Sequence, residues 1–127
     1  KFREGYDIVI GSRSTKDAKV LIKQGYLRIA AGKTFNLLIK LILQINFKDT
    51  QCGFKLINGR KGREIIKHSI IKKFCIDVEI LYLAKKFDLK IYEIGINWIK
   101  NKDSSVNLTK DSLNMFSDLI KIKINNY

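Results

Sequence analysis

The sequence contains few of the residues that usually build a metal site or a disulfide framework. Its 127 residues include two cysteines, Cys52 and Cys75, and a single histidine, His68. The cysteines are too widely spaced for a zinc quartet, and a lone histidine supplies no set of partner ligands. We therefore expect reduced, partly buried thiols, a reducing compartment and no metal ligands in this chain.

Acidic residues are also scarce. Twelve Asp and Glu stand against 25 Lys and Arg, which gives a formal net charge of +13. This charge favours anionic partners such as nucleic acid, phosphate groups or an acidic membrane surface. Only five of the cations are Arg, Ile and Asn are abundant and Pro is absent, a pattern that drift in base composition also produces. Composition alone therefore does not choose among these partners.

Long apolar runs are absent as well. The longest, residues 35–47, contains Lys40 and Gln44 and is shorter than the roughly 20 residues that a membrane-spanning helix needs. It predicts a core or interfacial helix. No signal peptide, Walker loop, GxGxxG loop, repeat or low-complexity linker is visible. The length suits one compact domain, and a strand-like run soon after a first residue that is not Met indicates a fragment.

Strand-like and helix-like segments alternate along the chain, which favours a layered α/β architecture. Short β-branched or alternating runs predict strands at residues 6–10, 52–57 and 90–98. Helical spacing of apolar residues predicts helices at residues 25–47, as one helix or as two with a break at Gly32, at 59–69, at 77–87, and from Asp111 or Ser112 onward. A polar loop is expected at residues 102–109.

The same patterns predict which side chains face the interior. In the basic helix at 59–69, Ile65 and Ile66 are expected to face inward, and Asp77 is expected to cap the helix at 77–87. In the strand at 90–98, Glu93 and Asn97 lie on one face; Tyr92, Ile94, Ile96 and Trp98 lie on the other. The final helix is expected to be amphipathic, with an apolar face made of Leu113, Phe116, Leu119, Ile120 and Ile124.

Four segments occur in an order that is typical of one family. They are DIVIGSR at residues 7–13, then Arg28, then DTQCGFK at 49–55, then DVEIL at 77–81. Together they resemble family-two glycosyltransferases, most closely the dolichyl-phosphate beta-glucosyltransferases. The strand IYEI at 91–94, the pair Asn97-Trp98 and the loop at 105–106 extend the resemblance over almost the whole chain. Dolichyl-phosphate mannose synthases share a looser form of the pattern.

The resemblance implies a fold, a reaction and a set of partners. The fold is an α/β nucleotide-diphospho-sugar transferase fold of the GT-A, Rossmann-like type, with residues 1–127 as the carboxy-terminal lobe of one catalytic domain. The reaction is inverting transfer of a sugar, glucose from UDP-glucose, onto dolichyl or polyprenyl phosphate. The enzyme is membrane-associated and works at the cytosolic face, of the endoplasmic reticulum in a eukaryote or of the plasma membrane in a bacterium. Glucose is favoured over mannose because Gln51-Cys52 and Asn97-Trp98 look closer to the glucosyltransferases.

The resemblance also implies that part of the active site lies elsewhere. The family binds the nucleotide sugar, with Mg²⁺ or Mn²⁺ held by an Asp-x-Asp motif, in the half that precedes these segments. No such motif occurs here, and Asp103, Asp111 and Asp118 are too dispersed to replace it. The chain alone is therefore expected to be inactive.

Candidate site residues follow from the match, each with a simpler structural alternative. Arg13 and Arg28 correspond to the arginines that hold the acceptor phosphate, because a guanidinium binds phosphate oxygens in a bidentate manner; the alternative is solvated surface arginines. Asp49 is the catalytic candidate, as a carboxylate that orients the acceptor or takes its proton; the alternative is a turn cap. Lys55 is expected to add a phosphate contact unless it is merely solvated.

Further residues are candidates for support of the site. Gln51, Asp77 and Glu79 are expected near it, although capping and helix-dipole complementarity explain Asp77 and Glu79 equally well. Trp98 is expected in the core, against lipid or stacked on a sugar. The basic cluster at residues 59–63 is a solvated face or a contact with membrane phosphates.

A rival from another class is a small basic nucleic-acid-binding module, which the +13 charge and the aromatic residues among lysines motivate. Against it, the chain shows no RNP-like, zinc-finger or helix-turn-helix signature. We therefore expect a nucleotide sugar, a polyisoprenyl phosphate and a membrane surface as partners, and no specific nucleic acid.

Overall fold

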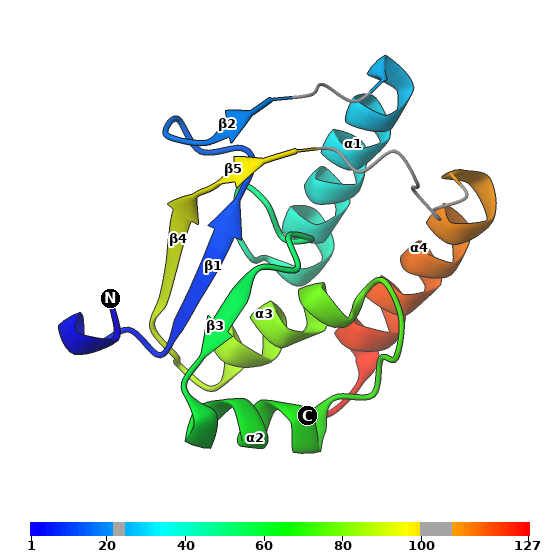
Figure 1. The fold of residues 1–127 in the computed structure, drawn as a ribbon. Helices are drawn as coiled ribbons and strands as arrows, with labels where there is room; N and C mark the ends of the chain where they lie inside the picture. The colour runs from blue at the N-terminus through cyan, green and yellow to red at the C-terminus, as the bar shows by residue number, and fades with distance from the viewer. Residues whose placement is uncertain (22–24, 100–107) are drawn as a thin grey trace.

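The structure is a computed structural model that describes residues 1–21, 25–99 and 108–127. It is a mixed α/β fold in which helices cover one side of a small sheet (Figure 1). The central strand is β1 (Ile8–Ser12). It pairs antiparallel with β3 (Lys55–Ile57) on one edge and parallel with β4 (Ile91–Gly95) on the other. The predicted α/β layering and the three predicted strands are therefore confirmed in outline.

A second, two-stranded sheet lies beyond the end of β1. It consists of β2 (Lys19–Val20) and β5 (Asn97–Trp98), which run parallel. The strand predicted at 90–98 is thus divided: β4 ends at Gly95, and the amide of Ile96 donates to the carbonyl of Ser12 at 3.1 Å before β5 begins. This break turns the chain from the main sheet to the small one and brings Trp98 past the end of β1.

Within residues 1–21, 25–99 and 108–127, the chain forms four α-helices, namely α1 (Tyr26–Leu43), α2 (Gly59–His68), α3 (Ile76–Lys86) and α4 (Leu108–Ile124). A short 3₁₀ helix, Phe2–Glu4, precedes β1. Helix α1 is continuous through Gly32, so the break considered at that residue does not occur. Helix α1 ends at Gln44, whose left-handed conformation (φ 57°) stops it.

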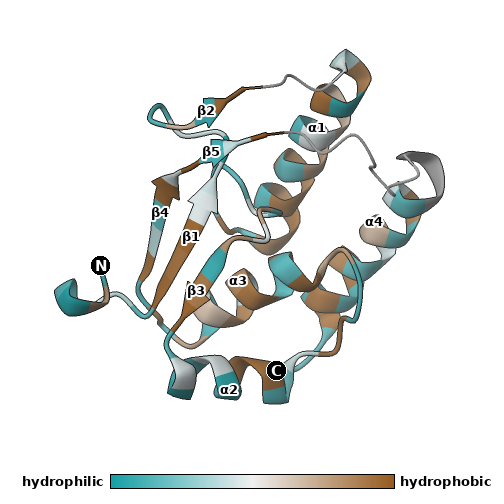
Figure 2. Cartoon of the chain, viewed as in Figure 1, coloured by the Kyte–Doolittle hydropathy of each residue, from teal (hydrophilic) through white to brown (hydrophobic). Residues whose placement is uncertain are grey.

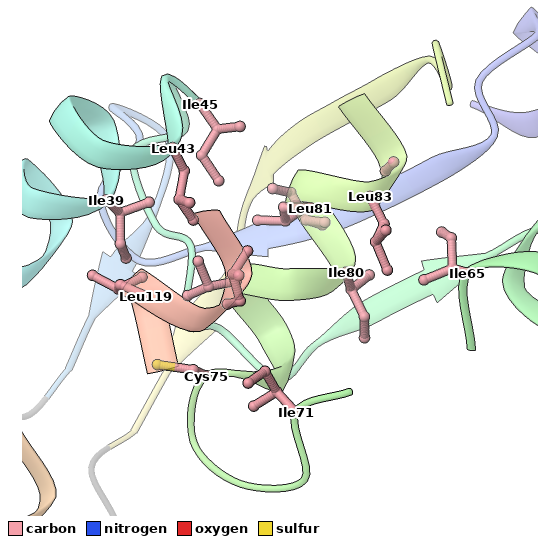
Figure 3. Close-up of a cluster of buried hydrophobic side chains, with 14 of the residues drawn as sticks. Ile39, Leu43, Ile45, Ile65, Ile71, Cys75, Ile80, Leu81, Leu83 and Leu119 are labelled. Carbon is pink, nitrogen blue, oxygen red and sulfur yellow. The ribbon is translucent and has the colours of Figure 1, made fainter. Parts of the chain in front are cut away.

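The core lies between the sheet and helices α1, α3 and α4 (Figure 3). Ile8 and Ile10 of β1 contribute the sheet side and are fully buried. Helix α1 packs beside α4 in Figure 1, and Ile39, Leu43 and Leu119 meet in the close-up. Both cysteines are buried and free, as expected, and burial raises the pKa of the Cys75 thiol to about 12.

Several expected contacts are wrong in detail. Ile65 is fully buried but Ile66 is 57% exposed, because adjacent residues of a helix point about 100° apart and only one of them can face α3. Asp77 does not cap α3, whose N-cap is Cys75; it lies in the first turn, where its charge complements the helix dipole. Most of the polar loop expected at 102–109 lies outside the described residues, and its last two residues belong to α4.

The final helix differs most from its prediction. It begins at Leu108, before the expected start, and of its predicted apolar face only Leu119 is fully buried. Leu113 and Ile124 are 75% and 72% exposed, while Ile122, which was not predicted, is fully buried. The helix packs on the core over a narrow stripe, so much of its apolar surface is uncovered. Figure 2 shows the hydropathy of each residue along the helix.

Apolar side chains are also exposed at the start of α1, where Tyr26 and Leu27 are 93% and 81% exposed. Residues 35–43, in contrast, include the buried positions of this helix, as the prediction of a core or interfacial helix required. In the described part of the chain, no helix combines the length and the apolar character needed to cross a bilayer.

Glu79 is a buried carboxylate that fixes the connection between α2 and α3. It accepts hydrogen bonds from the amides of Ile70 (2.8 Å) and Ile71 (3.1 Å), from the Ser69 hydroxyl and from the Tyr127 hydroxyl (2.6 Å). These contacts span α3, the preceding connection and the segment after α4. A fully buried charge is tolerated only when its oxygens are satisfied in this way.

We predict that Glu79→Ala lowers the free energy of unfolding by about 3 kcal/mol, because it leaves the buried amide donors without an acceptor. Tyr127→Phe, which removes one donor and keeps the carboxylate, is expected to cost about 1 kcal/mol. Urea titration measures both, with Glu64→Ala on the exposed face of α2 as the control. Equal stability of Glu79→Ala and Glu64→Ala would show that the carboxylate does not hold this connection.

Candidate functional site

A cavity of about 290 Å³ opens beyond the carboxyl end of β1, between the small sheet and the first half of α1. In Figure 1 this is the region between β2, β5 and the upper part of α1. Its walls come from four parts of the chain: the end of β1, the small sheet, the exposed first half of α1 and the segment that follows α1. The lining residues are Arg13, Ser14, Val20, Arg28, Ile29, Gly32, Lys33, Asn36, Lys48, Asp49, Thr50, Gln51 and Trp98.

Three features of the backbone bring the predicted residues to this cavity. Arg13 follows directly after the last residue of β1, so its side chain leaves the sheet at the cavity. Arg28 lies in the first turn of α1, where its amide donates to the carbonyl of Gly25 at 3.0 Å. Asp49 and Gln51 lie on the irregular segment between α1 and β3. The motifs that are separated in the sequence therefore meet at one place.

Arg13 and Asp49 form a bidentate ion pair in the wall of the cavity. The Nε of Arg13 donates to Oδ2 of Asp49 at 2.6 Å and a terminal nitrogen donates to Oδ1 at 2.8 Å. The backbone amide of Arg13 also donates to Oδ2 at 3.0 Å. The carboxylate of Asp49 is almost fully buried, at 7% exposure of the residue, whereas the side chain of Arg13 retains 30% exposure. The guanidinium is thus held on one edge and reachable on another.

The pair sets the protonation of both groups. Burial would raise the pKa of the Asp49 carboxyl, but hydrogen bonds from Arg13, its charge and the amides of Arg13 and Gln51 hold the pKa below its usual value. The hydrogen bond to Asp49 raises the pKa of the Arg13 guanidinium further, against the effect of burial. At neutral pH the cavity therefore contains an ionised carboxylate and a permanently charged guanidinium.

Gln51 belongs to the same site. It lines the cavity, and its amide donates to Oδ1 of Asp49 at 3.3 Å, in the geometry of a turn in which an Asp side chain bonds the backbone two residues on. Asp49 is thus both a turn cap and the partner of Arg13, because its two carboxylate oxygens accept hydrogen bonds from the Gln51 amide and from the Arg13 side chain.

The remaining predicted residues lie away from the cavity lining. Lys55 is nearly buried and donates to Oδ1 of Asp77 at 2.7 Å and to the carbonyl of Cys52 at 2.5 Å. Glu79 holds the connection between α2 and α3. These three side chains are therefore outside the cavity lining to which Arg13, Arg28 and Asp49 belong, and Lys55 and Asp77 form an ion pair with each other.

Other residues of the cavity were not among the predicted site residues, although stacking on a sugar was one alternative for Trp98. The guanidinium of Arg13 lies 5.5 Å from the centre of the Trp98 ring, a cation–π contact that places the tryptophan in the cavity wall. Gly32 and Asn36 follow Arg28 at intervals of four residues, and this helical spacing is the signal that places them on the same face. Within the described residues, the buried Thr50 hydroxyl and the side-chain oxygen of Asn36 have no hydrogen-bond partner.

Among the described residues, the lining carries four cationic side chains, Arg13, Arg28, Lys33 and Lys48, against the single carboxylate of Asp49. Such a cavity suits an anion with several oxygens. It does not suit a metal ion: in the described part of the chain, no three His, Cys, Asp or Glu side chains gather closely enough to hold one. The residues described here therefore do not fit the Mg²⁺ or Mn²⁺ that the resemblance implies.

The chain is similar to curated dolichyl-phosphate beta-glucosyltransferases. It is 35% identical over 117 residues to the protein of Dictyostelium discoideum, 34% identical over 118 residues to that of Saccharomyces cerevisiae, and 29% identical over 117 residues to the human protein. These alignments cover 91%, 92% and 92% of this chain. The chain spans only about a third of the length of each relative, 36%, 35% and 36% respectively.

No family model matches the chain, and no solved structure gives a significant match. The relatives share one name and agree with the family that the motifs at residues 7–13, 28 and 49–55 indicate. The resemblance is thereby confirmed: over about nine tenths of its length, this chain is a homologue of part of the dolichyl-phosphate beta-glucosyltransferases.

Proposed function

We propose that the full-length protein transfers glucose from UDP-glucose to dolichyl or polyprenyl phosphate, and that the cavity described above binds the acceptor phosphate. The observation that carries the proposal is the convergence of Arg13 and Arg28 in one cationic cavity of a chain whose relatives are named dolichyl-phosphate beta-glucosyltransferases. The curated relatives favour neither a mannose synthase nor a nucleic-acid-binding module. In this proposal, residues 1–127 form the acceptor-binding lobe of a GT-A catalytic domain.

The proposed chemistry needs little from a general base. An oxygen of the acceptor phosphate attacks the anomeric carbon of glucose, the bond from that carbon to the UDP oxygen breaks, and UDP leaves with the bonding electrons. Because attack comes from the side opposite the leaving group, configuration at the anomeric carbon inverts. The attacking phosphate is already ionised at neutral pH, so it must be positioned and its charge neutralised more than it must be deprotonated.

The need to position the phosphate and to neutralise its charge suggests a role for each cavity residue. Arg13 and Arg28 hold the phosphate oxygens, and Lys33 and Lys48 add positive charge around them. Asp49, whose lowered pKa makes it a poor proton acceptor, holds the Arg13 guanidinium in the orientation that the phosphate requires. Without Asp49, the flexible Arg13 side chain would sample many orientations and lose part of its binding energy.

The exposed apolar start of α1 supports a membrane-facing orientation. Tyr26 and Leu27 are almost fully exposed and immediately precede Arg28 and Ile29, which line the cavity. A lipid-linked phosphate must reach this cavity from the bilayer surface, and apolar side chains flanked by cations suit that surface. We propose that this end of the molecule rests on the cytosolic face of the membrane.

The Mg²⁺ or Mn²⁺ requirement remains a prediction for the full-length protein, with ligands outside the described residues.

The first test of the function compares two proteins. We predict that the full-length protein transfers glucose from UDP-glucose to a short polyprenyl phosphate, whereas the 127-residue chain alone does not, because its sequence lacks the Asp-x-Asp motif of the donor site. Radiolabelled glucose recovered in the lipid phase measures transfer. Transfer by the 127-residue chain would contradict this division of the active site, and transfer of mannose from GDP-mannose in place of glucose would reassign the donor.

The second prediction concerns the two arginines. In the full-length enzyme, Arg13→Ala or Arg28→Ala should raise the KM for polyprenyl phosphate about tenfold or more, because each lost charge-assisted hydrogen bond costs roughly 1.5–3 kcal/mol. The KM for UDP-glucose should change much less. Lys at either position should restore binding only in part, since it keeps the charge but loses the planar guanidinium.

The control for this series is Lys61→Ala, in the exposed basic face of α2, which removes one positive charge far from the cavity lining. Acceptor titrations at saturating UDP-glucose compare all variants. Equal effects of Lys61 and the two arginines would mean that diffuse attraction to an anionic lipid surface, and no defined phosphate site, accounts for the basic residues.

The third prediction tests whether Asp49 is ionised and paired. Its folded-state pKa lies below the unfolded value of about 3.9, so its ionisation stabilises the fold above that pH and the contribution disappears as the pH falls through the lower folded value. Asp49→Asn should therefore reduce the free energy of unfolding at neutral pH, and the difference from wild type should shrink below about pH 4. Urea titrations over this range measure it; a difference that does not change with pH would argue against the ion pair.

A further inference from the structure

The segment that carries Asp49 and Gln51 has no regular secondary structure. Between the end of α1 and the start of β3, residues 44–54 contain no helix or strand. At its ends, the amide of Gln44 donates to the carbonyl of Lys40 and the carbonyl of Phe54 accepts from the amide of Gly11. The backbone groups between them are outside any helix or strand ladder, so they must be satisfied in another way if the segment is to keep one conformation. The structure supplies side chains from neighbouring elements as partners.

Two of these side chains come from the sheet, from a single row of cross-strand neighbours. Ile10 of β1 pairs with Lys55 of β3 on one side and with Glu93 of β4 on the other. Directly paired residues point to the same face of a sheet, and this is the face on which the buried Ile10 meets the helices. A cation and a carboxylate thus flank Ile10 on the side of the sheet that is otherwise apolar.

The preceding row shows how unusual this is. Ile8 pairs with Ile57 and Ile91, and all three are apolar and belong to or pack against the core. One row further along, at the end of the sheet nearest the cavity, the two outer positions become Lys and Glu. A charged side chain on a covered face is costly unless it is bonded there, so each of these two must have a specific partner.

Both partners lie in the segment that carries Asp49. Glu93 accepts from the amide of Asp49 at 2.9 Å and from the amide of Lys48 at 3.0 Å, both at Oε1, with a longer contact of 3.2 Å from Lys48 to Oε2. Lys55 donates to the carbonyl of Cys52, further along the segment, and is itself held by Asp77. Side chains of the sheet thus bond the backbone of the segment at Lys48 and Asp49, and again at Cys52 beyond Gln51.

We propose that Glu93 is a positioning residue for the acceptor site, with Lys55 as its counterpart on the other side of the segment. By binding the amides of Lys48 and Asp49, Glu93 fixes the backbone from which the Asp49 carboxylate reaches Arg13. Its role for acceptor binding rests on the proposed function, whereas its role in holding the segment does not. Lys55 acts through the backbone of Cys52, which accounts for a buried lysine outside the cavity lining.

The chemistry of the contact suggests a discriminating pair of substitutions. Both amides donate to the same oxygen, Oε1, so a Gln side chain can still accept both through its carbonyl oxygen. An Ala side chain can accept neither. Glu93→Gln and Glu93→Ala therefore differ in the hydrogen bonds that hold Asp49, and Glu64→Ala, which removes an exposed carboxylate of α2, controls for the loss of one negative charge.

Hydrogen exchange at the amides of Lys48 and Asp49 tests the positioning role in the full-length protein, whatever reaction it catalyses. Glu93→Ala should accelerate exchange at these two amides by about tenfold or more, because their acceptor is lost. Glu93→Gln should stay within about threefold of wild type, and Glu64→Ala should leave both amides unchanged. Unchanged exchange in Glu93→Ala, or equal acceleration in Ala and Gln variants, would overturn the proposal.

Kinetics then separates positioning from mere stabilisation. If Glu93 acts through Asp49, Glu93→Ala should raise the KM for polyprenyl phosphate and lower kcat about tenfold, with rescue by Gln. The double variant Glu93→Ala with Asp49→Asn should be little worse than Asp49→Asn alone, since both remove the same constraint on Arg13. Additive effects, or kinetics that match wild type at a temperature where the fold persists, would overturn it. Absence of glucose transfer by the wild-type protein would instead refute the proposed function and leave the exchange result standing.

Discussion

The structure of the site depends on one interaction, the bidentate pair between the guanidinium of Arg13 and the buried carboxylate of Asp49. A carboxylate that is almost wholly removed from water requires compensation at both oxygens, and Arg13 and the backbone amides around it supply that compensation. The pair joins the end of β1 to the segment after α1. Arg28, Asn36 and Trp98 line the same cavity as Arg13 and Asp49, so the other walls lie around this junction.

The pair also explains how an acidic side chain can lie in the wall of a cavity that is otherwise lined by cations. A free carboxylate there would repel a phosphate, but this one already shares its charge with Arg13, and three further cations line the cavity. The carboxylate of Asp49 lowers the net positive charge of the cavity by one and fixes the orientation of the Arg13 guanidinium. Lys would be a poor substitute for Arg13, since an ammonium cannot bond Asp49 along one edge and present another edge outward.

Much of the fold could be predicted from the sequence because its elements have clear periods. The strand at 6–10, the helices at 59–69 and 77–87, and the apolar stretch at 35–47 agree with β1, α2, α3 and the buried half of α1. The failures have a common origin, since periodicity says which residues share a face but not which face is covered. Ile66 and Leu113 are apolar yet exposed, and α4 packs over a narrower stripe than its sequence offers.

The same limit applies to the site. The convergence of Arg13, Arg28, Asp49 and Gln51 could be anticipated because the family motif names them together, although their roles remain proposals. Glu93 could not, because in an alternating strand a charged residue is ordinarily assigned to the solvent side. Lys55 was expected to contact a phosphate because it belongs to the family motif at residues 49–55, and the sequence gives no sign of its neighbours in the fold. Its partners, Asp77 and the carbonyl of Cys52, are visible only when β3 is seen in register with β1 and against α3.

The small parallel sheet of β2 and β5 has a consequence for the order in which the molecule can assemble. Val20 and Trp98, which pair across it, are separated by most of the chain, and both are walls of the cavity. A parallel contact between such distant residues must pay a large loop-closure entropy before it yields any stability. During synthesis on a ribosome, Arg13, Arg28 and Asp49 are added to the chain before Trp98, so the cavity around them at first lacks the wall that Trp98 supplies. The lining of the cavity is therefore complete only after Trp98 has been synthesised.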